Sequence, residues 1–226
     1  MSEEFWEEDH NDDMPPAVTD DVVDLAFRIR GRTLPADHAW PLADALIAAL
    51  SWFADEPATG LHLIHAAASG NGWVSPEDDD EGVIYLSRRT CLTLRLPQER
   101  VAAAARTLEG ATLDVVGHPL EIGASQVHLL SPLTTLYARH VVAPGDDDEG
   151  NFLAAVVHEL EDNGITCRRM VCGRTRHFHS PQGPLLTRSL MLADLDFAES
   201  QRLQRIGLGP GPHHGFGLFI PHKAVK

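Results

Sequence analysis

Thirteen histidines supply most of the side chains in this 226-residue sequence that could transfer protons near neutral pH. His38 has the most informative position, because it stands in the segment LPADHAW at the predicted start of a helix. The helix dipole would favour a neutral imidazole there, and hence a general base, whereas Asp37 would partly oppose the dipole. The direction of any change in the pKa of His38 therefore stays open at the level of sequence.

Three further side chains could take part in proton transfer, with weaker support. His62 and His65 lie three positions apart in a predicted strand, so they should point to opposite faces of the sheet. Tyr85 also falls in a predicted strand, where a packing role is favoured. We therefore take His65 as the second candidate for acid or base chemistry, and assign none of the three as catalytic.

A metal site is the main rival interpretation of the C-terminal histidines. Cys167, Cys172, His177 and His179 are residue types that suit tetrahedral zinc. Their spacing is irregular, however, and two cysteines five positions apart on a strand would point to opposite faces. With Cys91 the cysteines make an odd number, so we expect reduced thiols and no disulfide framework. Because the spacing does not suit zinc, we also expect no bound metal or cofactor.

The segment GLGPGPHHGFG, residues 207–217, is the most distinctive stretch of the chain. It follows a predicted helix rather than a strand, and Pro210 and Pro212 lack backbone N–H donors, so neither a dinucleotide fingerprint nor a P-loop fits. Two interpretations remain open. The loop could bring its backbone close to a phosphodiester, with His213 and His214 beside it, or it could simply be a long flexible turn.

The elements that must position these residues follow from hydrophobic periodicity. Apolar residues alternate from Val23 to Ile29, which predicts a strand with one buried face. Asp37 is expected to cap the helix that follows. The first half is predicted to contain strands at about 23–30, 61–67, 83–86, 92–96 and 112–122 (turning at Gly117), and helices at 38–50 and 98–108.

The same order of elements recurs in the second half. Strands are predicted at 134–142, 166–180, 185–195 and 216–221, and helices at 151–163 and 198–206. The order β-α-β-β-α-β is typical of ferredoxin-like (RRM-like) domains. We therefore predict an α+β protein with an acidic disordered arm at 1–20, an N-terminal ferredoxin-like domain at 21–130, and a second at 131–226 that carries the glycine-rich loop.

Charge is unevenly distributed along the chain. The formal net charge is −15, but residues 1–21, 77–81 and 146–149 hold 18 of the 33 acidic residues and no Lys or Arg. The last third, from Gly164 onward, has nine basic residues against three acidic ones, and so could present an electropositive face. The acidic start is unlike a secretory signal, and no apolar run reaches membrane-spanning length, so we expect a cytoplasmic protein without membrane association.

Several segments together resemble a known family. They are LPADHAWPLADALIAAL, GLHLIHAAASGNGW, YLSRRTCLTLRLPQERV and ESQRLQRIGLGPGPHHGFGLFIP. These are similar to the CRISPR-associated repeat-RNA endoribonucleases, the Cas-six family, and in particular to its MYXAN-subtype branch. The resemblance runs from about Val22 to Pro221 and implies paired ferredoxin-like folds, binding of CRISPR repeats in precursor RNA, retention of the mature guide RNA, and metal-independent cutting that leaves a 2′,3′-cyclic phosphate.

The resemblance also implies roles for particular residues. His38 matches the histidine of the family motif and becomes the predicted general base. RNA contacts are expected from clustered arginines and from the glycine-rich loop, which carries Pro-His-His where the family often has Arg or Lys. The predicted RNA-binding residues are Arg88, Arg89, Arg168, Arg169, Arg174, Arg176, Arg202, Arg205, Gly209, Gly211, His213, His214 and Gly215.

Two other function classes remain open. The chain could be a non-catalytic RNA-binding subunit that holds guide RNA beside other subunits of a CRISPR interference complex, or, with less support, a zinc-binding structural module. A two-histidine phosphoesterase would also use paired ferredoxin-like halves, but none of the thirteen histidines is followed two positions later by Ser or Thr.

Overall fold

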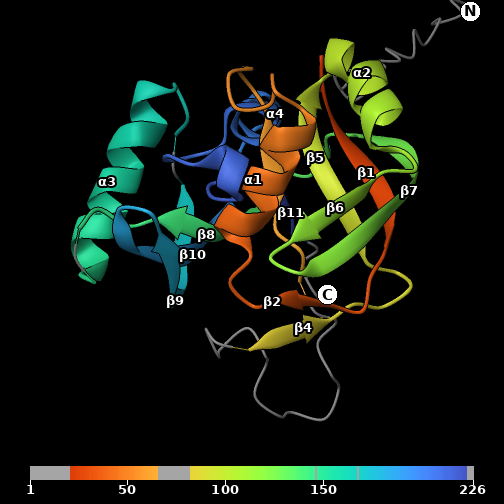
Figure 1. The fold of residues 1–226 in the computed structure, drawn as a ribbon. Coiled ribbons are helices and arrows are strands. Elements are labelled where there is room, and N and C mark those ends of the chain that lie inside the picture. The colour runs from red at the N-terminus through yellow and green to blue at the C-terminus, as the bar shows by residue number, and fades with distance from the viewer. Residues whose placement is uncertain (1–20, 66–81, 146, 167, 223–226) are drawn as a thin grey trace, which may run out of the picture.

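The computed structural model describes residues 21–65, 82–145, 147–166 and 168–222 (Figure 1). The predicted acidic arm at 1–20, the acidic tract at 77–81 and Cys167 lie outside the described residues. In the first half the elements are β1 (Val22–Arg30), β2 (Thr33–Pro35), α1 (Ala39–Ala49), β3 (Gly60–His62), β4 (Val83–Tyr85), β5 (Cys91–Pro97), α2 (Gln98–Leu108), β6 (Thr112–Val115) and β7 (His118–Leu129).

The first sheet has five antiparallel strands in the order β3-β5-β1-β7-β6. Alternation along β1 places Val23, Leu25 and Phe27 on the buried face. This face packs against the apolar sides of α1 and α2. The opposite face carries polar residues such as Asp24 and Arg28, and the second half of the chain covers part of it.

The second half repeats the arrangement with fewer strands. Its elements are β8 (Leu136–Val142), α3 (Glu149–Asp162), β9 (Arg169–Ser180), β10 (Gly183–Ala193), α4 (Phe197–Ile206), a 3-10 turn (Pro212–His214) and β11 (Ile220–Pro221). They form a sheet in the order β11-β8-β10-β9. In both sheets the first and third strands of the β-α-β-β-α-β unit form the central antiparallel pair, and the second and fourth strands flank it. This is the ferredoxin-like strand order, so the predicted fold class is confirmed.

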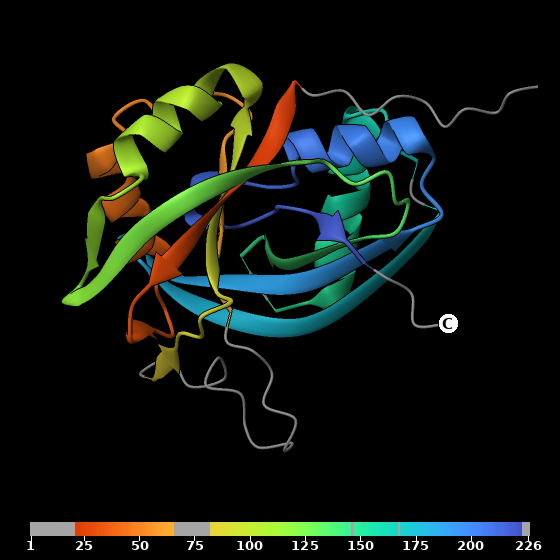
Figure 2. The same cartoon turned by 90° about the vertical axis from the view of Figure 1, so that its right-hand side faces the viewer.

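The two halves share apolar packing. A second core forms around α3, α4 and their sheet, but Phe178 of β9 and Phe216 of the glycine-rich loop pack into the core of the first half. Figure 2 shows β9 and β10 running beneath the strands β1 and β7. Residues far apart in sequence thus meet where the two sheets approach each other.

Three local features differ from the expectation. Residues 33–35 form β2, which pairs with β4 in a small separate sheet. The sequence did not predict β2, because a three-residue strand has too little periodicity to detect. The strand predicted at 61–67 is only Gly60–His62 within the described residues, so His65 lies beyond its end. Helix α1 has His38 as its N-cap without a side-chain cap, because the carboxylate of Asp37 accepts hydrogen bonds from His179 instead.

Within the part of the chain that is described, no helix is long and apolar enough to cross a bilayer.

Candidate active site at the junction of the two sheets

The ring of His38 lies at the start of α1 and is almost fully buried, with 3% of the residue exposed. Nδ1 lies 2.9 Å from the carbonyl oxygen of Pro35, and the amide of Ile64 donates to Nε2 at 3.0 Å. A carbonyl can only accept and an amide N–H can only donate, so the proton is on Nδ1 and the lone pair is on Nε2. The structure thus fixes both the orientation and the tautomer of the ring.

Burial also decides the charge of this ring. Loss of solvation lowers the pKa of His38 from 6.5 to about 4, and its hydrogen bond to Pro35 opposes this only partly. The charges of His65 and Arg176 lower the pKa further. The imidazole is therefore neutral at pH 7, as a base must be, but burial rather than the helix dipole is the main cause.

Strand β9 reaches the residues that precede His38. Arg176 donates to the carbonyl of Ala36 at 3.0 Å, and its guanidinium lies over the ring of Phe178 at 4.8 Å. The amide of His179 donates to Asp37 at 2.6 Å. Of the predicted arginines, Arg176 is therefore the one that the fold brings beside His38.

The glycine-rich loop lies against both halves, and its glycines are required by close packing. Gly217 has a φ of +69°, and a Cβ there would lie 1.9 Å from the carbonyl oxygen of Leu208. A Cβ on Gly215, at a φ of +92°, would lie 2.4 Å from the side chain of Leu63. These positions exclude any larger residue, so the glycines have a structural explanation that needs no ligand.

Backbone donors of this loop are used within the protein. The amide of Gly209 donates to the carboxylate of Glu159 at 2.6 Å, and that of Gly217 donates to the carbonyl of His140 at 2.7 Å. The amide of Gly209, which the sequence assigned to RNA, thus already has an anionic acceptor. Gly211, at a φ of +84°, begins the 3-10 turn that carries the two histidines.

Those histidines also point into the protein. His213 hydrogen-bonds the hydroxyl of Thr59 at 2.6 Å, while the ring of His214 lies 4.8 Å from that of Trp40. Burial lowers the pKa of both imidazoles, so neither is a source of positive charge at neutral pH. In this structure they attach the loop to α1 and to the turn after it.

The remaining predicted arginines fall into two groups. Arg88 and Arg89 are exposed between β4 and β5 and line a shallow hollow with Arg28, and Arg174 is exposed on β9. The other four bond to the protein around α4: Arg168 to Glu199, Arg169 to Asp194, Arg202 to the carbonyl of Asn163, and Arg205 to Asp21. Their assignment to RNA binding stays a prediction, but the fold gives these four structural partners.

Sequence reasoning missed a pair of residues on β8. Arg139 and His140 line a pocket of about 270 Å³ together with His62 and His65. The rings of His65 and His140 lie 5.8 Å apart. Arg139 and His140 belong to none of the motifs described above. The register of β8 against β10 brings both side chains into one pocket.

Among the described residues, no three His, Cys, Asp or Glu side chains gather closely enough to hold an ion. Cys172 lies beside Arg188, with Nη1 3.9 Å from the sulfur. Cys167, the other cysteine of the zinc alternative, lies outside the described residues.

Known proteins place this chain in a family. A family model described as Cas6 Crispr matches residues 23–224. The CRISPR-associated endonuclease Cas6 of Myxococcus xanthus (strain DK1622) is 32% identical over 199 residues, which cover 88% of this chain and 81% of that protein. A solved Cas6-related protein from Pyrococcus furiosus superposes with a TM-score of 0.62 at 10% identity, covering 88% of this chain and 97% of its own. A solved RAMP protein described as binding different RNA substrates has a TM-score of 0.61 at 10% identity, covering 87% and 98% of the two chains. The family resemblance of the sequence motifs is thus confirmed, and the chain belongs to the Cas6 family of CRISPR-associated proteins.

Proposed function

We propose that this protein is a metal-independent endoribonuclease that binds CRISPR repeats in precursor RNA and cuts them into mature guide RNAs. Membership of the Cas6 family supports this, as does the endonuclease name of the relative from Myxococcus xanthus. The structural observation that carries the proposal is the neutral imidazole of His38, with its lone pair on Nε2, at the junction of the two sheets.

The proposed reaction uses the RNA's own hydroxyl as the nucleophile. The ribose 2′-oxygen attacks the adjacent phosphorus while the bond from phosphorus to the 5′-oxygen breaks. A base takes the proton from the 2′-hydroxyl, and an acid gives a proton to the leaving 5′-oxygen. The products are a 2′,3′-cyclic phosphate and a 5′-hydroxyl, and donors or positive charge must stabilise the charge that builds up on the phosphate oxygens.

His38 is our proposed base, and its geometry sets a condition on that role. Its Nε2 has the lone pair that a base needs, but the amide of Ile64 occupies that lone pair and the ring is buried. The 2′-hydroxyl must therefore replace the Ile64 amide as the hydrogen-bond partner of Nε2. Ile64 lies beyond the end of β3, outside the paired part of the sheet, so no strand pairing has to break for this exchange.

The same geometry favours one competing function. If the bond between Ile64 and His38 is permanent, the ring is a structural brace, and the chain would be an RNA-binding subunit without cleavage of its own. The internal hydrogen bonds of the glycine-rich loop are compatible with either role.

Incubation of the full chain with a repeat RNA from the CRISPR array of the same genome, in excess EDTA, separates the two functions. Cleavage at one position per repeat supports the nuclease. Retained binding with intact RNA selects the RNA-binding subunit, and cleavage only after metal is added contradicts the proposed chemistry.

A further inference from the structure

The pocket of about 270 Å³ lies where the polar face of the first sheet meets β8 and the glycine-rich loop. Its lining includes His62 and Thr93 from the first sheet, His65 from the segment after β3, and Arg139 and His140 from β8. Ile64 donates its amide to His38, while its two chain neighbours, Leu63 and His65, line the pocket. The pocket and the proposed base are therefore next to each other.

A β-bulge explains why two consecutive residues of β8 reach the same pocket. Along β10, Arg188 pairs with Val141 and Leu190 pairs with Ala138, so Arg139 and His140 together oppose a single residue. Consecutive residues of a regular strand point to opposite faces, whereas an extra residue re-aims its side chain and is common beside functional sites. The bulge is further held by the hydrogen bond from the Gly217 amide to the carbonyl of His140.

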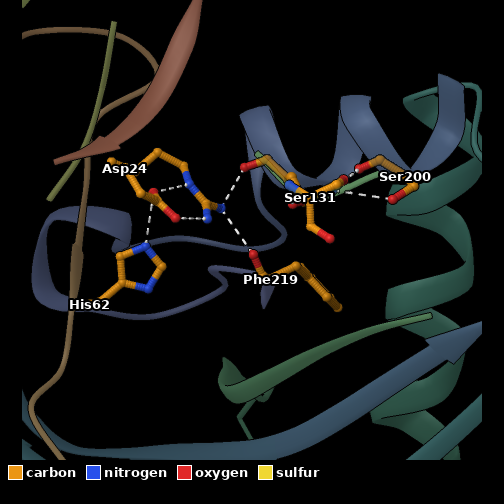
Figure 3. A network of polar contacts seen from close by, with 7 residues as sticks. Asp24, His62, Ser131, Ser200 and Phe219 are labelled. Atoms are coloured by element: carbon orange, nitrogen blue, oxygen red, sulfur yellow. Dashed lines mark hydrogen bonds and ion pairs between the residues drawn. The ribbon is translucent and has the colours of Figure 1, made fainter. Parts of the chain in front are cut away.

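The wall formed by the first sheet is fixed by a buried ionic network (Figure 3). Arg95, 1% exposed, donates to both carboxylate oxygens of Asp24 at 2.9 Å and to the carbonyls of Gln204 and Phe219. Asp24 also lies 3.2 Å from Nε2 of His62. The network holds His62 in place and neutralises the carboxylate of Asp24, which lines the pocket.

Among the described residues that line the pocket, the charge that remains is positive. Arg139 is exposed and, in the described part of the chain, makes no hydrogen bond or ion pair. The hydroxyl of Thr93 lines the same pocket and can donate a hydrogen bond to an anion. His62, His65 and His140 line it too, but Nε2 of His62 faces Asp24, and Nδ1 of His140 lies 3.4 Å from the hydroxyl of Thr187. A chain with a net charge of −15 therefore presents a basic hollow at the junction of its two sheets.

We propose that this pocket binds a backbone phosphate of the RNA, with Arg139 as the permanent charge and the hydroxyl of Thr93 as a neighbouring donor. This inference rests on the proposed function, because it takes RNA as the ligand. It adds a binding site for which the sequence motifs gave no sign, and it places a phosphate of the substrate beside the segment that covers His38.

The test uses a fluorescently labelled repeat RNA that carries a 2′-deoxy nucleotide at the cleavage position, so that binding is measured without cleavage. Fluorescence anisotropy at several salt concentrations gives the Kd and its salt dependence for the full chain and for Arg139→Gln. For Arg139→Gln we expect a Kd about 10-fold higher at physiological salt. The slope of log K against the log of the salt concentration should also be smaller, by the amount that corresponds to about one phosphate contact. Arg106→Gln is the matched control, because Arg106 is exposed on α2, on the opposite side of the sheet.

A second variant, Thr93→Val, removes a neutral donor but no charge from the pocket and should weaken binding less than Arg139→Gln does. Circular dichroism verifies that each variant folds. If Arg139→Gln binds with the Kd and salt slope of the unmodified protein while cleavage of all-ribose RNA is intact, the pocket inference is overturned and the nuclease is not. If the RNA binds and is never cut, yet Arg139→Gln shows the expected loss, the pocket inference stands and the nuclease fails.

Discussion

The amide of Ile64 and the ring of His38 form a hydrogen bond of 3.0 Å that fills the only lone pair of the proposed base. The bond joins the segment after β3 to the residue that precedes α1. RNA chemistry at Nε2 requires that this bond be exchanged for one from a ribose hydroxyl. The effects of changing His38 therefore separate a base from a brace.

Replacement His38→Ala is expected to slow single-turnover cleavage by about 10²- to 10⁴-fold while the Kd for uncleavable RNA changes little. The variant also leaves the Ile64 amide without its acceptor, at a cost of about 1–3 kcal/mol of folding stability. His158→Ala on the exposed side of α3 is the control, and it should change neither the cleavage rate nor the Kd. A parallel loss of cleavage and binding would assign His38 a purely structural role.

Stability should fall on acidification because of the same ring. The pKa of His38 is about 4 in the folded protein and 6.5 in an ordinary environment, so the unfolded chain binds the proton more readily between these values. The contribution of the neutral ring is complete above about pH 6.5 and is lost as the pH falls to about 4, by on the order of 3 kcal/mol. Chemical denaturation of the natural protein and of His38→Gln across this range measures it. Identical pH dependence of the two proteins would contradict the burial of a neutral His38.

Arg95 is buried, and its replacement should lower the free energy of unfolding strongly. Arg95→Met removes the guanidinium from the carboxylate of Asp24, which keeps only its contact with His62 among the described residues, and takes the Arg95 donors from two carbonyls of the second half. This should cost about 3–5 kcal/mol. Arg100→Met removes a partly exposed pair with Glu56 and a contact with Trp52, and should cost about 1 kcal/mol. Urea unfolding compares them, and equal midpoints for the two variants would mean that the Arg95 network does not join the halves.

Gly217 and Gly117 offer a matched comparison for the glycine-rich loop. Both have positive φ, at +69° and +76°, but a Cβ meets the carbonyl of Leu208 only at Gly217, and Gly117 has open space around it. Gly117→Ala should cost about 1 kcal/mol of strain, the general penalty of left-handed backbone for a residue with a Cβ. Because Gly217→Ala must also displace backbone, the drop in its thermal unfolding midpoint should be several-fold larger than the drop for Gly117→Ala. Equal shifts would remove the packing explanation for this glycine.

The sequence predicted the long elements well because their periodicity reports burial directly. The apolar residues of β1 and α2 give the strand and the helix almost to the residue, and the order of such elements predicted both ferredoxin-like units. The short β2 was missed because its pairing with β4 is a tertiary property.

The site was harder to predict because its features depend on packing between the halves. The motif identified His38 but could not show that Ile64 covers its Nε2. Arg139 and His140 became visible only through a bulge in β8, which alternation along a single strand does not reveal. The glycine-rich loop was recognised, but its glycines are explained by backbone contacts that need three-dimensional neighbours.

The chemistry of the RNA ends tests the central proposal most directly. In excess EDTA, the unmodified protein should cut all-ribose repeat RNA to products with a 2′,3′-cyclic phosphate and a 5′-hydroxyl, identified by mass spectrometry. A single 2′-deoxy nucleotide 5′ to the cut should abolish cleavage without weakening binding. Products with a 3′-hydroxyl and a 5′-phosphate, or continued cutting of the 2′-deoxy RNA, would contradict attack by the ribose hydroxyl.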